Sequence, residues 1–221
     1  MIELGLIFLY LAVGVAGQDW WAVAREDKRR EYVLKPLVMT LLFVAAALLG
    51  SDDSGRRVGF TLAAIALSAA GDVFLMLRRR RFLAGLTAFL LAHVAYVVAF
   101  DTFRADLRTI TTFGVVLVLG AGLYVRLVRG MRARGELALA VPVGLYNVAI
   151  AAMVTSALLT VSRPGWAGFE SGIAIAGALL FMISDTLIGW TRFVRSFRRS
   201  EVAITVTYHL AQVLLVLALL R

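Results

Sequence analysis

Residues 58–81 read VGFTLAAIALSAAGDVFLMLRRRR. The first twenty residues of this stretch carry no charge except on Asp72, and four arginines follow at once. Because roughly 20 apolar residues at 1.5 Å each cross the hydrocarbon layer of a bilayer, the stretch predicts a transmembrane helix that ends at a basic loop. An ionisable side chain inside such a helix costs roughly 2.5 to 3.5 kcal/mol, so Asp72 is expected to face a partner or a water-filled cavity.

The same alternation of apolar runs and basic clusters fills the chain, which is 61% hydrophobic but carries 23 Lys plus Arg against 14 Asp plus Glu. We predict an all-α polytopic membrane protein with eight transmembrane helices, folded as a single transmembrane domain over residues 1–221. The expected spans are 3–22, 33–50, 58–77, 82–101, 109–126, 138–161, 168–190 and 201–220.

Lys and Arg are distributed unequally between the two sets of loops, which predicts the orientation. The connections after the first, third, fifth and seventh spans hold sixteen, and the others hold five. The first set is Arg25, Lys28, Arg29 and Arg30; Arg78 to Arg81; Arg126, Arg129, Arg132 and Arg134; and Arg192, Arg195, Arg198 and Arg199. We expect these loops to be cytoplasmic and both termini to lie on the outer side of a bacterial inner membrane. The first residues lack the basic segment of a signal peptide, so the first span is expected to be retained.

A weak internal repeat relates the two halves of the chain. Ala70-Gly71-Asp72 precedes a basic run and a span with His93 and Tyr96, and Ile183-Ser184-Asp185 precedes a basic run and a span with Tyr208 and Gln212. A duplicated unit of four helices would relate the halves by an axis along the membrane normal. This 4+4 parallel repeat would bring Asp72 and Asp185 to the same depth, facing each other.

Several classes of function are disfavoured. The chain has no cysteine, so it has neither disulfides nor thiolate sites. Its net charge of +9 comes from short clusters beside apolar spans, which indicates membrane-flanking charge rather than nucleic-acid binding. No nucleophile elbow, P-loop or dinucleotide turn is present, and the two histidines show no close metal-ligand spacing. We expect no metal and no cofactor.

Of the acidic side chains, only Asp72 and Asp185 lie well inside the expected spans, whereas Glu3, Asp19 and Glu201 fall at span ends. Both lie about 9 to 10 Å inside the basic boundary, given their six- and seven-residue distances from the next arginine. If they share a cavity, repulsion and desolvation leave one protonated, and such a pair supplies a general acid and a general base. The alternative is that each one only pairs with an arginine or a neighbouring helix.

Other polar side chains could line the interior of the bundle. Lys35, beside Pro36 in the expected first turn of the second span, either binds a phosphate or carboxylate or extends to the interface as an ordinary membrane lysine. The remaining candidates are His93, Tyr96, Tyr146, Asn147, Tyr208, His209 and Gln212. Taken singly, each more often makes a hydrogen bond between helices, but together with the two aspartates they predict a polar lumen.

In sequence the chain resembles the YhhN-like family of membrane proteins, whose characterised members are lysoplasmalogenases. The resemblance covers nearly the whole chain. It rests on Lys35-Pro36, Gly71-Asp72 with Leu75-Met76, His93 with Tyr96, Tyr146 with Met153, Ser184-Asp185, Arg192-Phe193, and Tyr208 with Ala211-Gln212.

The resemblance implies hydrolysis of the vinyl ether bond of a lysoplasmalogen, giving a fatty aldehyde and a glycerophospho-base. Protonation of the outer alkene carbon makes an oxocarbenium ion, and water adds to give a hemiacetal that collapses. One of Asp72 and Asp185 would be the acid, and the other would stabilise the cation and activate water. Lys35 would hold the phosphate of this lysophospholipid-type substrate, and the residues that bind or orient it would be His93, Tyr96, Tyr146, Asn147, Tyr208 and Gln212.

Two readings from other classes remain open. Paired intramembrane carboxylates and a parallel repeat also suit a proton-coupled transporter of a small or lipid-like substrate. A lipid-binding or assembly protein with a structural polar core is the third reading. The sequence gives surrounding membrane lipids as further partners, but gives no oligomeric state.

Overall fold

The computed structural model describes residues 1–50, 55–77 and 81–220. Within these ranges the chain forms eight helices that are long and apolar enough to cross a membrane, which confirms the predicted all-helical architecture. They are α1 (Ile2–Ala24), α2 (Lys28–Leu49), α3 (Arg56–Leu77), α4 (Phe82–Phe100), α5 (Leu107–Ala133), α6 (Ala140–Leu159), α7 (Gly168–Phe193) and α8 (Ser200–Leu219). Short 3-10 turns, η2 (Leu137–Leu139) and η3 (Thr160–Ser162), flank α6. The chain is therefore a multi-pass membrane protein.

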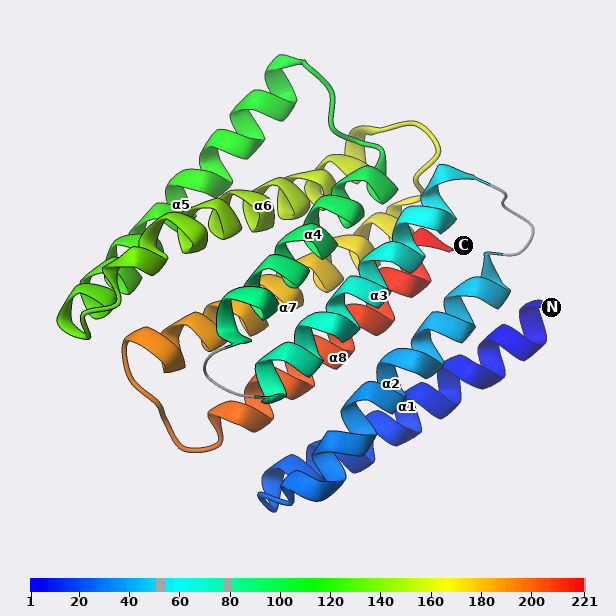
Figure 1. Cartoon of the computed structure of the whole chain (residues 1–221). Helices are drawn as coiled ribbons and strands as arrows, with labels where there is room; N and C mark the ends of the chain where they lie inside the picture. The colour runs from blue at the N-terminus through cyan, green and yellow to red at the C-terminus, as the bar shows by residue number, and fades with distance from the viewer. Residues whose placement is uncertain (51–54, 78–80, 221) are drawn as a thin grey trace.

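The helices run up and down in one bundle, and α1 begins at the end where α8 finishes (Figure 1). Contacts pass from α1 through α2, α3, α4, α6, α7 and α8 back to α1, and α5 packs outside this ring on α6 and α7. We call the end with the α1–α2, α3–α4, α5–α6 and α7–α8 connections the basic end, and the opposite end the far end. The 4+4 repeat stays a prediction. In such a repeat α5 would correspond to α1, but α5 packs on α6 and α7, whereas α1 packs on α2 and α8.

The start of α2 differs from the expectation that Pro36 marks the first turn of the second span. The helix begins at Lys28, because the side chain of Asp27 caps it by accepting the Arg30 backbone N–H. Pro36 therefore lies inside the helix, where it lacks an N–H for the preceding turn. The extra turns carry Lys35 on a helix rather than on a loop edge, and this fixes the direction of its side chain.

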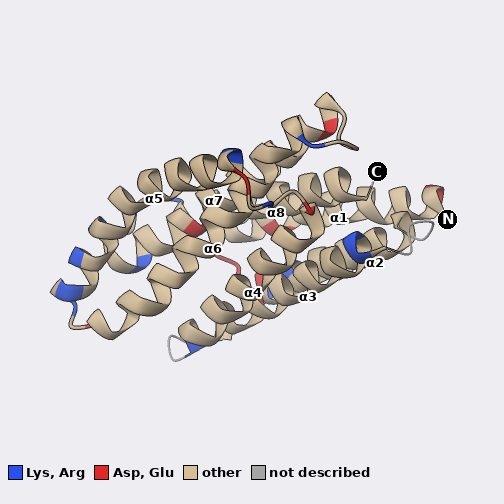
Figure 2. Cartoon of the chain, turned by 90° about the horizontal axis from the view of Figure 1, so that it is seen from above, with Lys and Arg blue, Asp and Glu red and all other residues tan. Residues whose placement is uncertain are grey.

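At the basic end, α5 continues beyond its expected span of 109–126. α5 continues to Ala133, so Arg126, Arg129 and Arg132 belong to the helix and not to the following loop. Arg78 to Arg80 lie outside the described residues, and Arg81 occupies the N-cap position of α4 without a side-chain capping bond. Most of the ribbon between the helix ends carries neither sign of charge (Figure 2).

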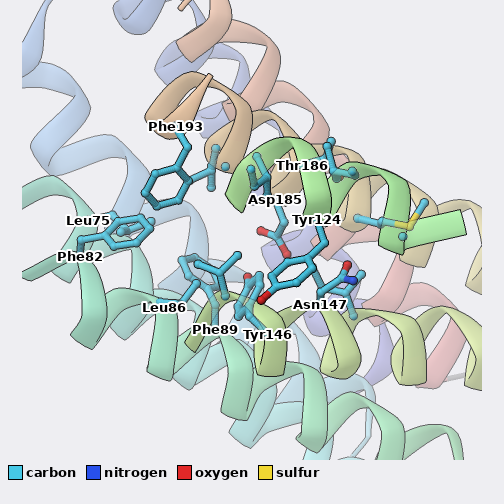
Figure 3. Close-up of a pocket in the computed structure, with 18 residues that line it drawn as sticks. Leu75, Phe82, Leu86, Phe89, Tyr124, Tyr146, Asn147, Asp185, Thr186 and Phe193 are labelled. Atoms are coloured by element: carbon cyan, nitrogen blue, oxygen red, sulfur yellow. The ribbon is translucent and has the colours of Figure 1, made fainter. Parts of the chain in front are cut away.

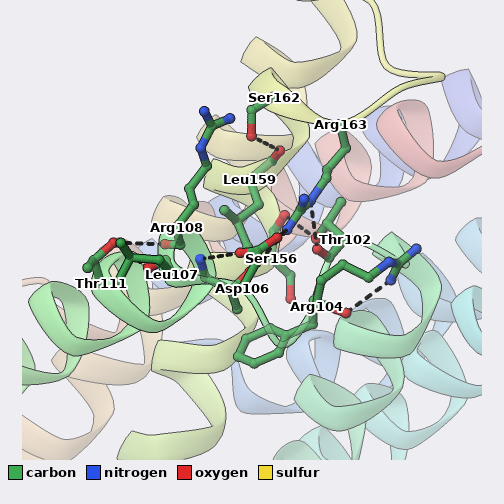
Figure 4. A network of polar contacts seen from close by, with 12 residues as sticks. Thr102, Arg104, Asp106, Leu107, Arg108, Thr111, Ser156, Leu159, Ser162 and Arg163 are labelled. Carbon is green, nitrogen blue, oxygen red and sulfur yellow. Dashed lines mark hydrogen bonds and ion pairs between the residues drawn. The ribbon is translucent and has the colours of Figure 1, made fainter.

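A polar network joins two connections at the far end (Figure 4). Arg163 pairs with Asp106 at 2.6 Å and donates to the Thr102 carbonyl at 3.1 Å, and the Thr102 hydroxyl donates to the Ser156 carbonyl at 2.7 Å. The Thr109 backbone N–H and then the Arg163 guanidinium lower the pKa of Asp106 to about 2. The network ties the α4–α5 connection to the α6–α7 connection, away from both intramembrane aspartates.

Candidate active site

Asp185 meets a histidine from another helix in the interior of the bundle. It lies on α7, where Oδ2 is 3.1 Å from Nε2 of His93 on α4, and the two side chains are 2% and 0% exposed. The other ring nitrogen of His93, Nδ1, lies 2.6 Å from the Phe89 carbonyl oxygen. Tyr146 of α6 packs edge-on against the imidazole with ring centroids 5.3 Å apart, and its phenol interacts with the Asp185 carboxylate. Three helices thus converge on one carboxylate.

Asp72 on α3 is also buried, but among different groups. The Tyr208 phenol of α8 interacts with its carboxylate, and Lys35 of α2 is the cation with the largest electrostatic effect on it. Gly71 allows α4 to approach at this level, because a Cβ there would lie only 2.5 Å from the ring of Phe89. The small residue before the aspartate therefore has a packing role.

The two carboxylates are close enough for Asp185 to act electrostatically on Asp72. They open into two cavities that share Leu75, Phe82 and Ile188 in their walls. Asp185 lines the first cavity and Asp72 lines the second. The sequence places the two aspartates at matching depth, and the fold puts them on either side of a common wall.

The first cavity, which we call the apolar channel, lies between α4, α5, α6 and α7 (Figure 3). Figure 3 shows the Asp185 carboxylate pointing among the side chains that line it. Tyr146 and Asn147 are the other polar residues of the expected site that reach this channel. Its apolar wall includes Leu86, Phe89, Leu123, Leu127, Val143 and Ile150. An alkyl chain fits such a lining, because its burial there removes apolar surface from water.

The second cavity, which we call the polar vestibule, lies at the basic end and reaches Asp72. Its charged side chains belong to Lys28, Glu31, Lys35, Arg134, Arg192 and Glu201. Lys28 joins α2 to α8 by pairing with Glu31 at 2.8 Å and with Glu201 at 2.6 Å. Lys35 pairs with Glu31 at 3.4 Å and is only 12% exposed. Both signs of charge are present, as a zwitterionic head group requires.

Four of the expected substrate-binding residues do not line either cavity. Tyr96 donates to the Gln212 side-chain oxygen at 2.5 Å, a fully buried bond between α4 and α8. The Tyr208 hydroxyl lies 3.3 Å from the Met39 sulfur. His93 contacts Asp185 without lining the apolar channel. Of the expected substrate-binding residues, Lys35, Tyr146 and Asn147 line the two cavities.

Asp19 is a further buried carboxylate, which sequence reasoning placed at a span end. It is 0% exposed, and neither oxygen has a hydrogen-bond partner among the described residues. Lys35 and Glu31 act on it electrostatically, and it acts in turn on Asp72. Its spacing from the buried Ala12, Ala16 and Val23 follows the helical period, which was the available signal.

His209 on α8 is the second buried histidine. The indole N–H of Trp20 donates to its Nδ1 at 3.1 Å. Among the residues that the structure describes, no cluster of three His, Asp or Glu side chains is arranged to hold a metal ion.

Fold and site together define a multi-pass membrane protein with a buried carboxylate site between an apolar and a charged cavity. The chain belongs to the YhhN family, whose model matches residues 30–219. It is 28% identical to the human lysoplasmalogenase TMEM86B over 89% of this chain and 79% of that protein. A lysoplasmalogenase of Mycobacterium bovis is 31% identical over 80% of this chain and 66% of its own length. No solved structure matches the chain.

Proposed function

We propose that this protein is a membrane enzyme that hydrolyses the vinyl ether bond of a lysoplasmalogen to a fatty aldehyde and a glycerophospho-base. The observation that carries this proposal is that Asp185 lines the apolar channel and Asp72 lines the polar vestibule, two cavities that have wall residues in common. A lysolipid has one apolar chain and one charged head, and its scissile bond lies where the two meet. The names of the relatives at about 30% identity support the same reaction.

The substrate would bind with its alkenyl chain in the apolar channel and its head group in the polar vestibule. Lys35 would attract the phosphate, because it is the least exposed lysine of the vestibule. Glu201, which is 64% exposed at the mouth, is available to the ammonium group of an ethanolamine or choline head. Tyr146 and Asn147 would fix the first atoms of the chain beside Asp185.

The chemistry needs one protonated carboxyl and one carboxylate. The acid protonates the outer alkene carbon, which leaves an oxocarbenium ion on the carbon bonded to oxygen. The carboxylate stabilises this cation and takes a proton from the water that attacks it. Collapse of the hemiacetal releases the aldehyde and the glycerol hydroxyl. Tyr208, Tyr96, Gln212 and His93 would hold the carboxylates from behind, and they would not touch the lipid.

The location follows from the excess of Lys and Arg at the basic end. We infer that this end faces the cytoplasm of a bacterial cell, that both termini lie on the outer side of the inner membrane, and that the site occupies the cytoplasmic half. The whole chain would then work as one transmembrane domain, with substrate entering from the cytoplasmic leaflet.

The test is turnover by the purified protein in detergent, with a lysoplasmalogen and an ester lysophospholipid as parallel substrates. Release of aldehyde is expected only from the first, and Asp72→Asn and Asp185→Asn should each lower it by about 100-fold or more. Asp101→Asn is the matched control, because Asp101 is 57% exposed at the far end. Turnover of neither lipid would remove the proposal and favour proton-coupled flux, measured in sealed vesicles.

A further inference from the structure

The hydrogen bond between His93 and the Phe89 carbonyl indicates which ring nitrogen of His93 carries a proton. Nδ1 lies 2.6 Å from the Phe89 carbonyl oxygen, and a carbonyl oxygen only accepts, so Nδ1 must donate. In the neutral ring Nε2 then has a lone pair, and it lies 3.1 Å from Asp185 Oδ2. This is an ion-pair contact, and neither atom has a hydrogen-bond partner among the described residues. A lone pair facing an ionised oxygen in a buried site is repulsive, and a proton between Asp185 and His93 would relieve that repulsion.

His209 shows the opposite arrangement. An indole N–H only donates, so the contact from Trp20 makes Nδ1 of His209 the acceptor and leaves the proton of the neutral ring on Nε2. No such geometry supplies Asp72 with a histidine partner. Its neighbours are the Tyr208 phenol and the positive charge of Lys35. Asp185 is therefore the carboxyl group of the site that has a partner to hold its proton.

The cavities agree with this assignment. The carbon that accepts the proton is the second carbon of the alkenyl chain, so it lies on the chain side of the scissile bond. Asp185 lines the apolar channel, where that chain would bind (Figure 3), whereas Asp72 lines the polar vestibule, where water and the head group would be. Resting on the proposed function, we propose that Asp185 is the general acid, that His93 is its positioning residue, and that Asp72 is the base.

The proton balance closes over one turnover. Asp185 gives its proton to the second alkenyl carbon, and the π electrons form the new C–H bond. Water attacks the oxocarbenium carbon while Asp72 takes one of its protons. In the collapse, the hemiacetal hydroxyl returns a proton to Asp185, the bond from carbon to the glycerol oxygen breaks, and Asp72 protonates that oxygen. One water is consumed and both carboxyl groups return to their first state.

The groups around the acid come from four helices. Tyr146 of α6 interacts with Asp185 through its phenol, and Asp72 of α3 and Tyr208 of α8 are coupled to it electrostatically. His93 of α4 is the only one of these that offers a lone pair on nitrogen. A His93→Gln variant keeps polar atoms and bulk at this point but removes the imidazole that positions the proton of Asp185.

The first test reads the proton without substrate. The chain has two histidines, so a protein with nitrogen-15 in histidine alone, purified on a histidine-free tag, gives four ring-nitrogen signals. We expect His93 with a protonated Nδ1 and a hydrogen-bonded or protonated Nε2, and His209 with the reverse tautomer. The His93 Nε2 signal should shift in Asp185→Asn and not in Asp72→Asn. A proton on Nε2 with a bare Nδ1, or an Nε2 insensitive to Asp185→Asn, would overturn the shared proton.

The second test separates the two roles. In heavy water, Asp72→Asn should still protonate the chain reversibly, so recovered lysoplasmalogen should contain deuterium at the second alkenyl carbon. Asp185→Asn and His93→Gln should show less of this exchange, about 100-fold less in Asp185→Asn. Exchange in Asp185→Asn but not in Asp72→Asn would reverse the assignment and contradict the proposal. If the wild type leaves the lipid untouched, the proposed function fails, while the nitrogen signals still decide the shared proton.

Discussion

Asp72 and Asp185 have nearly the same sequence context and very different surroundings. Each follows a small residue and precedes a basic run by six or seven positions. In the fold, Asp185 meets an imidazole and the apolar channel, whereas Asp72 meets a phenol, a lysine and the polar vestibule. Depth along a helix is set by local sequence, but chemical role depends on which helices pack against that depth. The two sides of the site can therefore be perturbed separately.

The largest effect is expected on the Asp72 side, from Lys35→Met. The change removes the most buried cation of the vestibule and should lower kcat/KM for lysoplasmalogen about 100-fold, mainly through KM, because a desolvated phosphate partner is lost. Lys28→Met is the control, since Lys28 is 52% exposed, and it should cost less than about fivefold. Steady-state kinetics checks both variants. Equal losses would show that the vestibule acts only through its total charge.

Tyr96→Phe tests the hydrogen bond from Tyr96 to Gln212, which joins α4 to α8. It leaves the Gln212 oxygen buried and without its donor, so the free energy of unfolding should fall by about 1 to 3 kcal/mol. The measurement is thermal or denaturant unfolding in detergent. Adding Gln212→Leu removes the stranded polar group and should restore part of the loss. A double variant less stable than Tyr96→Phe would contradict this account.

Gly120→Val narrows the apolar channel on the Asp185 side. A Cβ at Gly120 would lie 3.0 Å from the Asn147 side-chain oxygen, whereas Gly122 on the same helix has open space around it. Gly120→Val should therefore lower kcat/KM for a long alkenyl chain about tenfold more than for a short one. Gly122→Val should leave the ratio unchanged. An equal fall in kcat/KM for the long and the short substrate would show that the alkenyl chain binds elsewhere.

The smallest effect is expected at Asp106, which lies outside both sides of the site. Its pKa is lowered from 3.8 to about 2 by the Thr109 N–H and the Arg163 guanidinium. A carboxylate with a lowered pKa stabilises the fold fully above 3.8, and this contribution is lost as the pH falls through about 2. Melting temperature followed down to that pH should drop less steeply in Asp106→Asn than in the wild type. Parallel curves would show that the network adds no stability.

Much of the fold could be predicted, because hydropathy and charge are local properties. The eight membrane-spanning helices were expected from the sequence. The errors lie where side chains extend or cap a helix. Asp27 caps α2 so that it begins at Lys28, and α5 continues through its arginines to Ala133. Apolar run length says nothing about such polar turns, since they lie beyond the hydrocarbon layer.

The candidate site was less predictable from the chain. The burial and electrostatic coupling of Asp72 and Asp185 agree with their expected depth, and their catalytic roles stay a proposal. The contact between His93 and Asp185 joins residues 92 positions apart by number, and no spacing rule connects them. Asp19 was missed because a residue five positions before a helix end is interfacial or buried according to its neighbours.

The sequence alone determined that the chain crosses a membrane eight times, which loops are basic, and how deep its two central carboxylates lie. These properties follow from transfer of each residue between water and hydrocarbon, which depends on that residue and its near neighbours. Only the tertiary structure decided that Asp185 meets the His93 imidazole, that Asp72 opens to a charged vestibule, and that Asp19 is sealed inside. Those facts depend on packing between helices distant in sequence, and packing is what distinguishes two similar aspartates.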